Sequence, residues 1–383
     1  ENLSKAIGRR GQNVRLATKL LNYEINIMTD QEDSERRQVE FKEKTPVARW
    51  HQVNSSLDVF PTTNFVRTSG LNLDNNGIMW VSIYGSQTSL HAYNGNTWKG
   101  LPNVPSNKVK NIVTDKNNLK WIQLQNDGLL VFDDNNTPFL STDDRYLKVT
   151  TGSNPGLLSN EIRSIAVDDN GWIWIGTSVG LNVVTNTNDA FTDLEVEQLI
   201  VNDIDGKAAY LLGENSINDI CVDGGDRKWF ATNDGAVLVE SDGQSQVLKF
   251  TAENSPLLAN RVVSIGQNTE SGEVFFATSK GIVSYQSDAA GKKELFGKIK
   301  VYPNPIPPGY SGAITIDGLA TNAEIRITDA NGMLVSKLKA NGSKAIWNGL
   351  RLNGTRPNSG VYYIFGINRD ATETAMGKFI FVR

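Results

Sequence analysis

The chain has 383 residues, a formal net charge of −4 and a hydrophobic fraction of 39%. This length is sufficient for more than one hydrophobic core. A single cysteine, Cys221, excludes an intrachain disulfide, and no apolar run is long enough for a transmembrane helix, so the chain is not expected to span a membrane.

Residues 1–60 contain two short stretches in which apolar and polar residues alternate, Tyr23–Ile27 and Val39–Phe41, with a charged stretch between them. Alternation of this kind predicts two outer strands of a sheet. Their place in the fold depends on the repeats that follow.

Between Thr68 and Tyr285 one short unit recurs five times: an apolar strand, an acidic or amide residue, a polar turn, a large aromatic, and a second strand that closes on glycine. The aromatics lie 41 to 55 residues apart and are Trp80, Trp121, Trp174, Trp229 and Phe275. This period is the length of one four-stranded propeller blade. The sequence therefore predicts an all-β protein with a β-propeller over residues 61–297, whole or partial, of about five to seven blades. On this reading residues 1–60 are degenerate blades or the end of a preceding propeller.

The tryptophans of the repeat occupy equivalent positions and are expected to pack between blades. Each follows an aspartate by six residues, and the four aspartates are Asp74, Asp115, Asp168 and Asp223. Aspartate hydrogen-bonds the backbone of tight turns, which explains its place before the second strand. An asparagine eight residues before the acidic or amide position is expected to turn the chain into the innermost strand, at Asn107, Asn160, Asn215 and Asn260.

The third unit carries a family resemblance. Its segments Asn154–Asn160, Ile165–Asp168 and Trp172–Thr177 resemble the two-component regulator propeller repeat of Bacteroidetes. That resemblance implies a seven-bladed propeller of the kind found on the periplasmic side of hybrid sensor kinases and in some secretion proteins.

The organisation changes near residue 297, where a proline-rich stretch, Tyr302–Pro308, marks a boundary. Residues 298–383 carry a net charge of +6, whereas the preceding residues carry −10. Either the two parts meet different partners or the tail has a solvated basic surface. Short alternating strands and the turn Asp329–Gly332 predict a small immunoglobulin-like β-sandwich over residues 298–383.

The order of motifs in this sandwich resembles the C-terminal sorting domain of type IX secretion. The motif residues are Tyr302, Pro303, Asn304, Pro305, Gly332, Gly360, Val361, Tyr362, Lys378 and Arg383. The resemblance implies export through the periplasm to the outer-membrane cell surface.

Residues that carry reactive chemistry are scarce. The two histidines, His51 and His91, are not spaced as metal ligands, and His91 is expected on the surface of an outer strand. Cys221 lies in a small-residue position of a predicted inner strand and is expected to be structural. Adjacent acids such as Asp168 and Asp169 are explained by turns. We therefore expect no enzymatic activity, no metal and no cofactor, and the acidic body argues against nucleic acid as a partner.

Two tryptophans outside the repeat positions, Trp98 and Trp172, are candidates for stacking on a sugar. The alternative for each is packing on its own blade.

Three functions compete. The first joins both resemblances: a cell-surface component of type IX secretion that binds glycan or lipopolysaccharide and docks to outer-membrane or secretion-complex proteins. That family implies two propellers before the sorting domain, so this chain would be a C-terminal fragment. The second is a secreted cargo propeller with a cleavable sorting tail, and the third is the oligosaccharide-sensing ectodomain of a hybrid two-component system.

Overall fold

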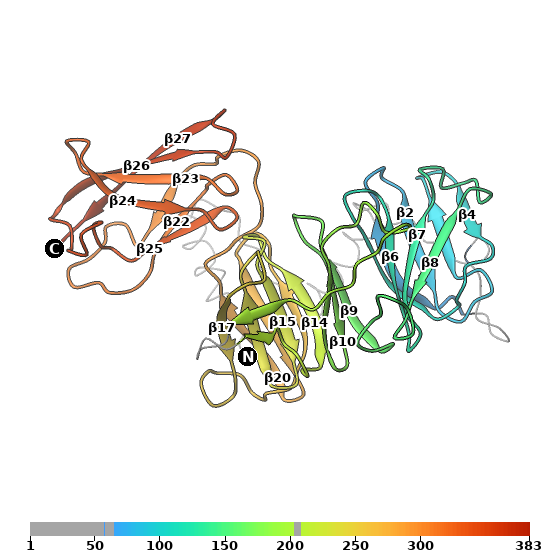
Figure 1. The fold of residues 1–383 in the computed structure, drawn as a ribbon. Coiled ribbons are helices and arrows are strands. Elements are labelled where there is room, and N and C mark those ends of the chain that lie inside the picture. The colour runs from blue at the N-terminus through green and yellow to red at the C-terminus, as the bar shows by residue number, and fades with distance from the viewer. Residues whose placement is uncertain (1–56, 58–64, 203–207) are drawn as a thin grey trace, which may run out of the picture. The chain divides into compact units, whose positions relative to one another are not determined.

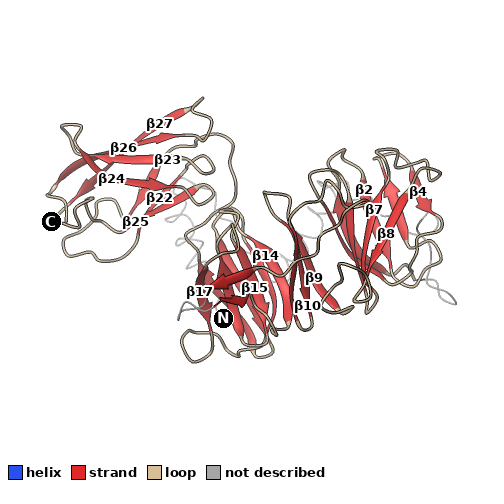
Figure 2. Cartoon of the chain, in the orientation of Figure 1, coloured by secondary structure: helices blue, strands red, loops and turns tan. Residues whose placement is uncertain are grey.

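The computed structural model describes residue 57, residues 65–202 and residues 208–383. The prediction for residues 1–60 lies outside the described residues, except for Leu57, which is buried. Figures 1 and 2 show only strands and loops in the described part of the chain, as the repeats predict. Residues 56–383 form one compact unit.

Five antiparallel blade sheets follow one another along the chain (Figure 1). The first blade contains β1 (Thr68–Leu73), β2 (Met79–Ile83), β3 (Leu90–Tyr93) and β4 (Trp98–Leu101). The second contains β5 (Val109–Thr114), β6 (Lys120–Leu124), β7 (Gly128–Asp133) and β8 (Arg145–Val149). The third contains β9 (Ile162–Val167), β10 (Ile173–Thr177) and β11 (Gly180–Val184), and the hairpin β12 (Ile200–Asn202) and β13 (Ala208–Tyr210) follows it. The fourth contains β14 (Ile217–Val222), β15 (Lys228–Thr232), β16 (Gly235–Val239) and β17 (Gln246–Phe250), and the fifth contains β18 (Val262–Gln267), β19 (Glu273–Thr278) and β20 (Gly281–Gln286).

The first strands of consecutive blades lie side by side, since β1 contacts β5, β5 contacts β9, β9 contacts β14 and β14 contacts β18. The four predicted asparagines each lie two residues before one of these strands. Asn160 and Asn260 accept hydrogen bonds from Thr151 N (2.8 Å) and Ala252 N (2.7 Å), which fixes the loops that enter β9 and β18. The predicted turn role of these two residues is confirmed.

The repeat tryptophans are packing anchors, as predicted: all four are fully buried. The blades approach closely where the facing residue is small, because a Cβ on Gly176 would lie 2.6 Å from Cγ2 of Ile217 in the next blade. The two terminal faces differ from the inner ones. Phe275, in the fifth aromatic position, is 39% exposed, and Leu71 of the first blade is 64% exposed where its counterpart Ile165 is buried. These two faces lack a neighbouring blade within the described part of the chain.

The C-terminal sandwich contains two antiparallel sheets, ordered β21-β22-β25 and β24-β23-β26-β27. Its strands are β21 (Lys300–Tyr302), β22 (Ile314–Asp317), β23 (Glu324–Thr328), β24 (Leu334–Lys339), β25 (Lys344–Trp347), β26 (Gly360–Ile367) and β27 (Thr374–Phe381). One core lies between the sheets, where Trp347 packs against Phe379 at 5.7 Å and Tyr362 stacks on the same ring. This is the sandwich that the alternating segments predict.

The connector between the fifth blade and β21, residues 287–299, is bonded both to the propeller and to the sandwich. Arg227 reaches Asp288 at 2.7 Å, and Asp288 accepts a hydrogen bond from Asn341 at 3.3 Å. Gly224 and Gly342 both lie directly against the carbonyl of Ala290, since a Cβ on either would come within 2 Å of that oxygen. Glycine is required at both positions because any side chain would collide with the connector backbone.

Candidate functional site

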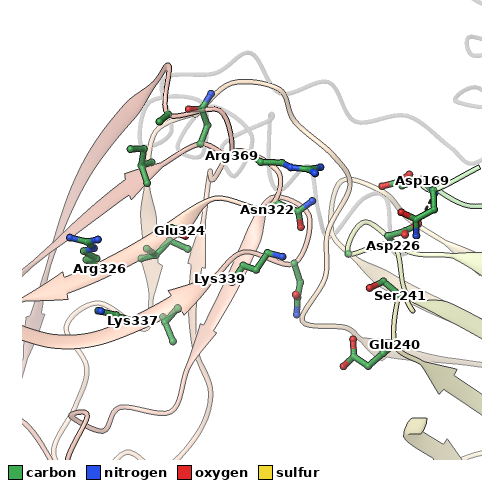
Figure 3. Close-up of a pocket in the computed structure, with 18 residues that line it drawn as sticks. Asp169, Asp226, Glu240, Ser241, Asn322, Glu324, Arg326, Lys337, Lys339 and Arg369 are labelled. Carbon is green, nitrogen blue, oxygen red and sulfur yellow. Dashed lines mark hydrogen bonds between the residues drawn. The ribbon is translucent and has the colours of Figure 1, made fainter. Parts of the chain in front are cut away.

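A cavity of about 1090 Å³ lies between propeller turns and the sandwich (Figure 3). The propeller wall comes from the turns after β9, β14 and β16, and the sandwich wall comes from β23, β24 and the turn after β26. Figure 3 shows that the two walls differ in charge. The acidic wall presents Asp169, Asp226 and Glu240, and the opposite wall presents Glu324 together with Arg326, Lys337, Lys339 and Arg369.

The acidic wall is largely engaged by the protein itself. Asp226 accepts the backbone N–H of Asp169 at 2.8 Å and lies 3.4 Å from Nζ of the buried Lys228. Burial raises the pKa of Asp226, although the bond from Asp169 and the charge of Lys228 oppose that rise. Asp169 in turn pairs with Lys292 of the connector. These carboxylates therefore have protein partners and are not free to bind a cation.

The opposite wall, called the basic wall from here on, contains Arg326, Lys337, Lys339 and Arg369, and its charges are not paired in the same way. Arg326 and Lys337 are exposed and directly opposite each other on β23 and β24, and Glu324 is opposite Lys339. Within the described residues no ion pair engages Arg326, Lys337, Lys339 or Arg369. Like charges directly across a sheet repel each other, so a bound anion would relieve this repulsion. The wall is suited to an anionic ligand with several acceptor oxygens.

Histidine and cysteine, which serve as metal ligands or nucleophiles, are scarce around the cavity. Among the residues that the structure describes, no group of three or more His, Cys, Asp and Glu side chains could hold a metal ion. The lining residues of the cavity include no histidine or cysteine. In the described part of the chain, no helix has the length and apolar character that a bilayer span requires.

The structure brings several sorting-motif residues together. Asn304 accepts the N–H of Ile380 at 3.1 Å, and Tyr302, Asn304 and Lys378 line one groove at the edge of the sandwich. Both Tyr302–Pro303 and Asn304–Pro305 are cis peptides.

The rest of the motif is placed elsewhere in the sandwich. Tyr362 is buried in the core and donates to the carbonyl of Asn358 at 2.8 Å. Arg383 donates to the side chains of Asn358 (3.2 Å) and Ser359 (2.9 Å). Gly332 lies apart, in the β23–β24 turn at φ 82°. Gly360 begins β26, and Val361 is exposed on that strand.

Both candidate glycan-stacking tryptophans are half-buried on their own blades. Trp98 stacks on Tyr93 with ring centroids 4.6 Å apart, and Trp172 packs on Trp174 at 6.3 Å. Neither lines the cavity between the propeller and the sandwich. Their role in sugar binding stays a prediction.

The prediction for His91 was wrong. His91 lies on β3, the third of four strands in its blade, and is fully buried. A neighbouring glycine, Gly100 on β4, leaves room for the ring. Cys221 packs at the edge of the core of the fourth and fifth blades, and burial raises the pKa of its thiol to about 11, with the nearby Asp219 and Asp223 adding to the effect. A thiol that stays protonated is a poor nucleophile.

Comparison with known families identifies both parts of the described chain. The two component regulator propeller family matches residues 156–179, and the secretion system C-terminal sorting domain family matches residues 300–382. Among solved structures, PorZ of Porphyromonas gingivalis is similar with a TM-score of 0.59 and 26% identity. PorZ is described as an essential bacterial surface component of the type-IX secretion system. The similarity covers 88% of this chain and 48% of PorZ, so the chain spans about half the length of that protein.

An extracellular domain of a hybrid two component system from B. thetaiotaomicron also matches, with a TM-score of 0.43 and 12% identity over 85% of this chain and 46% of that one. On the two family matches and the similarity to PorZ, the described chain carries propeller repeats followed by a type IX sorting domain and resembles about half of PorZ. This combination is that of an exported, cell-surface protein.

The N-terminal residues match a different family. Residues 1–35 match the NusA-like second KH domain. A 45-residue segment is 58% identical to the transcription termination/antitermination protein NusA of Rickettsia prowazekii, and it covers 12% of this chain and 9% of that protein. KH domains clamp nucleic acid with a Gly-X-X-Gly loop, and the chain has this pattern at Gly8-Arg9-Arg10-Gly11. Our sequence reading missed it, because we read the first sixty residues only for strand alternation.

The match covers residues 1–35, which belong to the segment that the sequence analysis assigned to degenerate blades or to the end of a preceding propeller.

Proposed function

We propose that the propeller and sandwich act together as a non-enzymatic docking component of type IX secretion at the cell surface. The observation that carries this proposal is the similarity to PorZ, which extends over both parts and includes the sorting domain. On this proposal the partners are outer-membrane or secretion-complex proteins.

We further propose that an anionic glycan, such as the charged polysaccharide of a lipopolysaccharide, binds at the basic wall of the cavity. The support is the exposed set Arg326, Lys337, Lys339 and Arg369, which lacks protein counter-ions among the described residues. Several cations on one rigid sheet can engage several anionic groups of a polymer at once, which strengthens binding through multivalency.

The test uses the full chain and vesicles that contain lipopolysaccharide with an anionic polysaccharide. The triple variant Lys337→Glu/Lys339→Glu/Arg369→Glu should weaken vesicle binding at least 10-fold. A matched triple variant on the propeller, Lys249→Glu/Arg261→Glu/Lys280→Glu, makes the same change in net charge and should bind like the wild type. Equal loss in both variants would mean that only net charge matters, and no loss in the first would exclude the basic wall.

A second measurement separates a machine component from secreted cargo. The mature protein isolated from the cell surface should retain residues 302–383 when examined by intact mass spectrometry. Loss of this segment would identify the sandwich as a cleaved sorting tail and would favour the cargo function.

A further inference from the structure

β27 has an unpaired edge. It is the last strand in the order β24-β23-β26-β27, and on its outer side only the C-terminal end is paired, through a parallel bridge between Phe381 and Ile306. The carbonyl of Ile380 accepts from Ile306 N at 2.8 Å, and Ile380 N donates to Asn304, so both backbone groups of Ile380 point away from β26. Backbone groups alternate along a strand, so those of Met376 and Lys378 point the same way. Within the described residues no backbone hydrogen bond reaches them from that side.

A groove of about 760 Å³ runs along this edge, between β27 and β21. Its walls carry three lysines, Lys298, Lys300 and Lys378, and no acidic side chain is among its lining residues. Gly377 lets the segment before β21 pack closely against β27, since a Cβ there would lie 2.7 Å from Cγ2 of Ile299. The groove beside Met376 and Lys378 is therefore strongly basic.

Apolar side chains continue from the groove onto the outer face of the same sheet. Phe365 and Met376 are cross-strand partners, 44% and 66% exposed, and Val361 and Ile380 are partners, 40% and 45% exposed. Lys378 lies on β27 between these two pairs. Exposed apolar side chains beside charged residues are typical of a protein interaction site.

We propose that the free edge of β27 docks an extended acidic segment of a partner protein, with apolar side chains at alternate positions. The segment would add a strand to the sheet through Met376 and Lys378, place its carboxylates against the three lysines of the groove, and lay its apolar side chains on the outer face. A second copy of the sandwich is disfavoured as occupant, because it would bring the same lysines into the groove. A glycan would leave the aligned backbone donors and acceptors of the edge unused. The proposal rests on the edge of β27, the lysines of its groove and the outer face of β26 and β27, and it is independent of the basic wall.

The experiment measures fluorescence anisotropy of a labelled (Glu-Val)₄ peptide with the full chain, and a (Lys-Val)₄ peptide is the charge-inverted control. The acidic peptide should bind at least 10-fold more tightly. Lys300→Glu/Lys378→Glu should weaken it at least 10-fold.

Met376→Pro is the diagnostic variant. It removes an N–H that points outward and leaves the ladder with β26 intact, so the fold is retained while strand addition is blocked. We expect a loss of at least 10-fold, against less than 3-fold for Met376→Ala, with unchanged circular dichroism for both. If Met376→Pro does not fold, Lys300→Glu/Lys378→Glu still tests whether the acidic peptide binds in this groove.

Three outcomes would overturn the proposal. Equal affinity for both peptides would remove the charge complementarity. Peptide binding that dextran sulfate abolishes but Met376→Pro leaves intact would mean a polyanion site without strand addition. A dimer in light scattering that Met376→Pro dissociates would make a second copy the occupant. None of these results affects the vesicle test of the basic wall, whose residues lie on β23, β24 and the turn after β26.

Discussion

In the first three blades the repeat aspartate bonds both the turn and the tryptophan ring. In the third blade, Oδ1 of Asp168 accepts the backbone N–H groups of Asn170 and Trp172, and Oδ2 accepts Nε1 of Trp174 at 2.9 Å. The same pattern recurs in the first two blades, with Asp74 and Asp115. The carboxylate therefore fixes the turn and orients the ring that packs on the next blade, which explains the constant six-residue spacing.

The fourth blade breaks this pattern. There Arg227 occupies Oδ2 of Asp223 at 2.8 Å, and Nε1 of Trp229 is buried without a hydrogen-bond partner among the described residues. A buried unsatisfied donor costs about 1–3 kcal/mol.

The two tryptophans give a matched prediction. Trp174→Phe loses the bond to Asp168, whereas Trp229→Phe removes a donor that has no partner. Both lose similar volume, so Trp174→Phe should destabilise the protein by about 1–3 kcal/mol more than Trp229→Phe. Chemical denaturation of the two variants measures the difference. Equal destabilisation would show that the bond to Asp168 contributes nothing.

A second residue-scale prediction concerns Asp144. Burial raises its pKa to about 6, the hydrogen bond from Tyr146 opposes the rise, and the nearby Asp143 adds to it. Because the folded-state pKa is above the unfolded value of 3.8, the folded state binds more protons between about pH 4 and pH 6, and stability falls as the pH rises through this window.

Asp144→Asn removes this pH-dependent loss of folding stability, because the amide does not ionise. After discounting for partial exposure, it should raise stability by about 1 kcal/mol at pH 7.5 and leave it unchanged near pH 3.5. Thermal unfolding at the two pH values checks this, and Glu270→Gln on an exposed turn controls for the change in net charge. A gain that is the same at both pH values would assign the effect to packing.

At the scale of the strand, the second strands of the inner blades are buried on both faces, as β6, β10 and β15 show. Small residues let such strands come close to the next blade. Gly176→Ala should therefore cost about 1–3 kcal/mol, because its Cβ would overlap Ile217.

Gly266 on β18 is the control for this substitution. A Cβ there meets nothing within 4 Å, so Gly266→Ala should stay within about 0.5 kcal/mol of the wild type. Similar losses in both variants would mean that strand propensity, and not blade contact, sets the cost. Urea unfolding with a common m-value provides the comparison.

Most strands and their buried faces could be predicted from the sequence, because repeat period and apolar alternation are local properties of the chain. The strands of the sandwich and the burial of the four repeat tryptophans followed from them. The burial of His91 did not, since it depends on how β4 and Gly100 cover β3, which no local pattern encodes. The groove beside β27 depends on β21 lying near a strand that is over 70 residues away in sequence.

At the scale of the whole chain, the oppositely charged walls of the cavity join parts that the sequence could only describe as an acidic body and a basic tail. The charge asymmetry indicated that the two parts differ. It could not indicate that Asp169 would be engaged by Lys292 while no ion pair among the described residues engages Arg326 or Lys337. Which charges are free is a property of the contact between the parts.

That contact depends on Arg227. Its guanidinium is 5% exposed and joins Asp223 of the fourth blade, at 2.8 Å, to Asp288 of the connector, at 2.7 Å. Arg227→Met leaves Asp223 buried without its cation, which costs about 3 kcal/mol, and releases the connector. The connector contains the tryptic sites Lys292 and Lys293, so local opening can be read as cleavage.

Limited trypsin digestion of Arg227→Met should cut after Lys292 or Lys293 at least 5-fold faster than in the wild type, and should release a fragment that extends to Arg383. Arg261→Met, an exposed arginine on the propeller, should cut at the wild-type rate. If cleavage of Arg227→Met is unchanged while its unfolding free energy falls, Arg227 stabilises only its own blade. In that case the glycine contacts on Ala290 hold the sandwich, and Gly342→Ala should produce the faster cleavage instead.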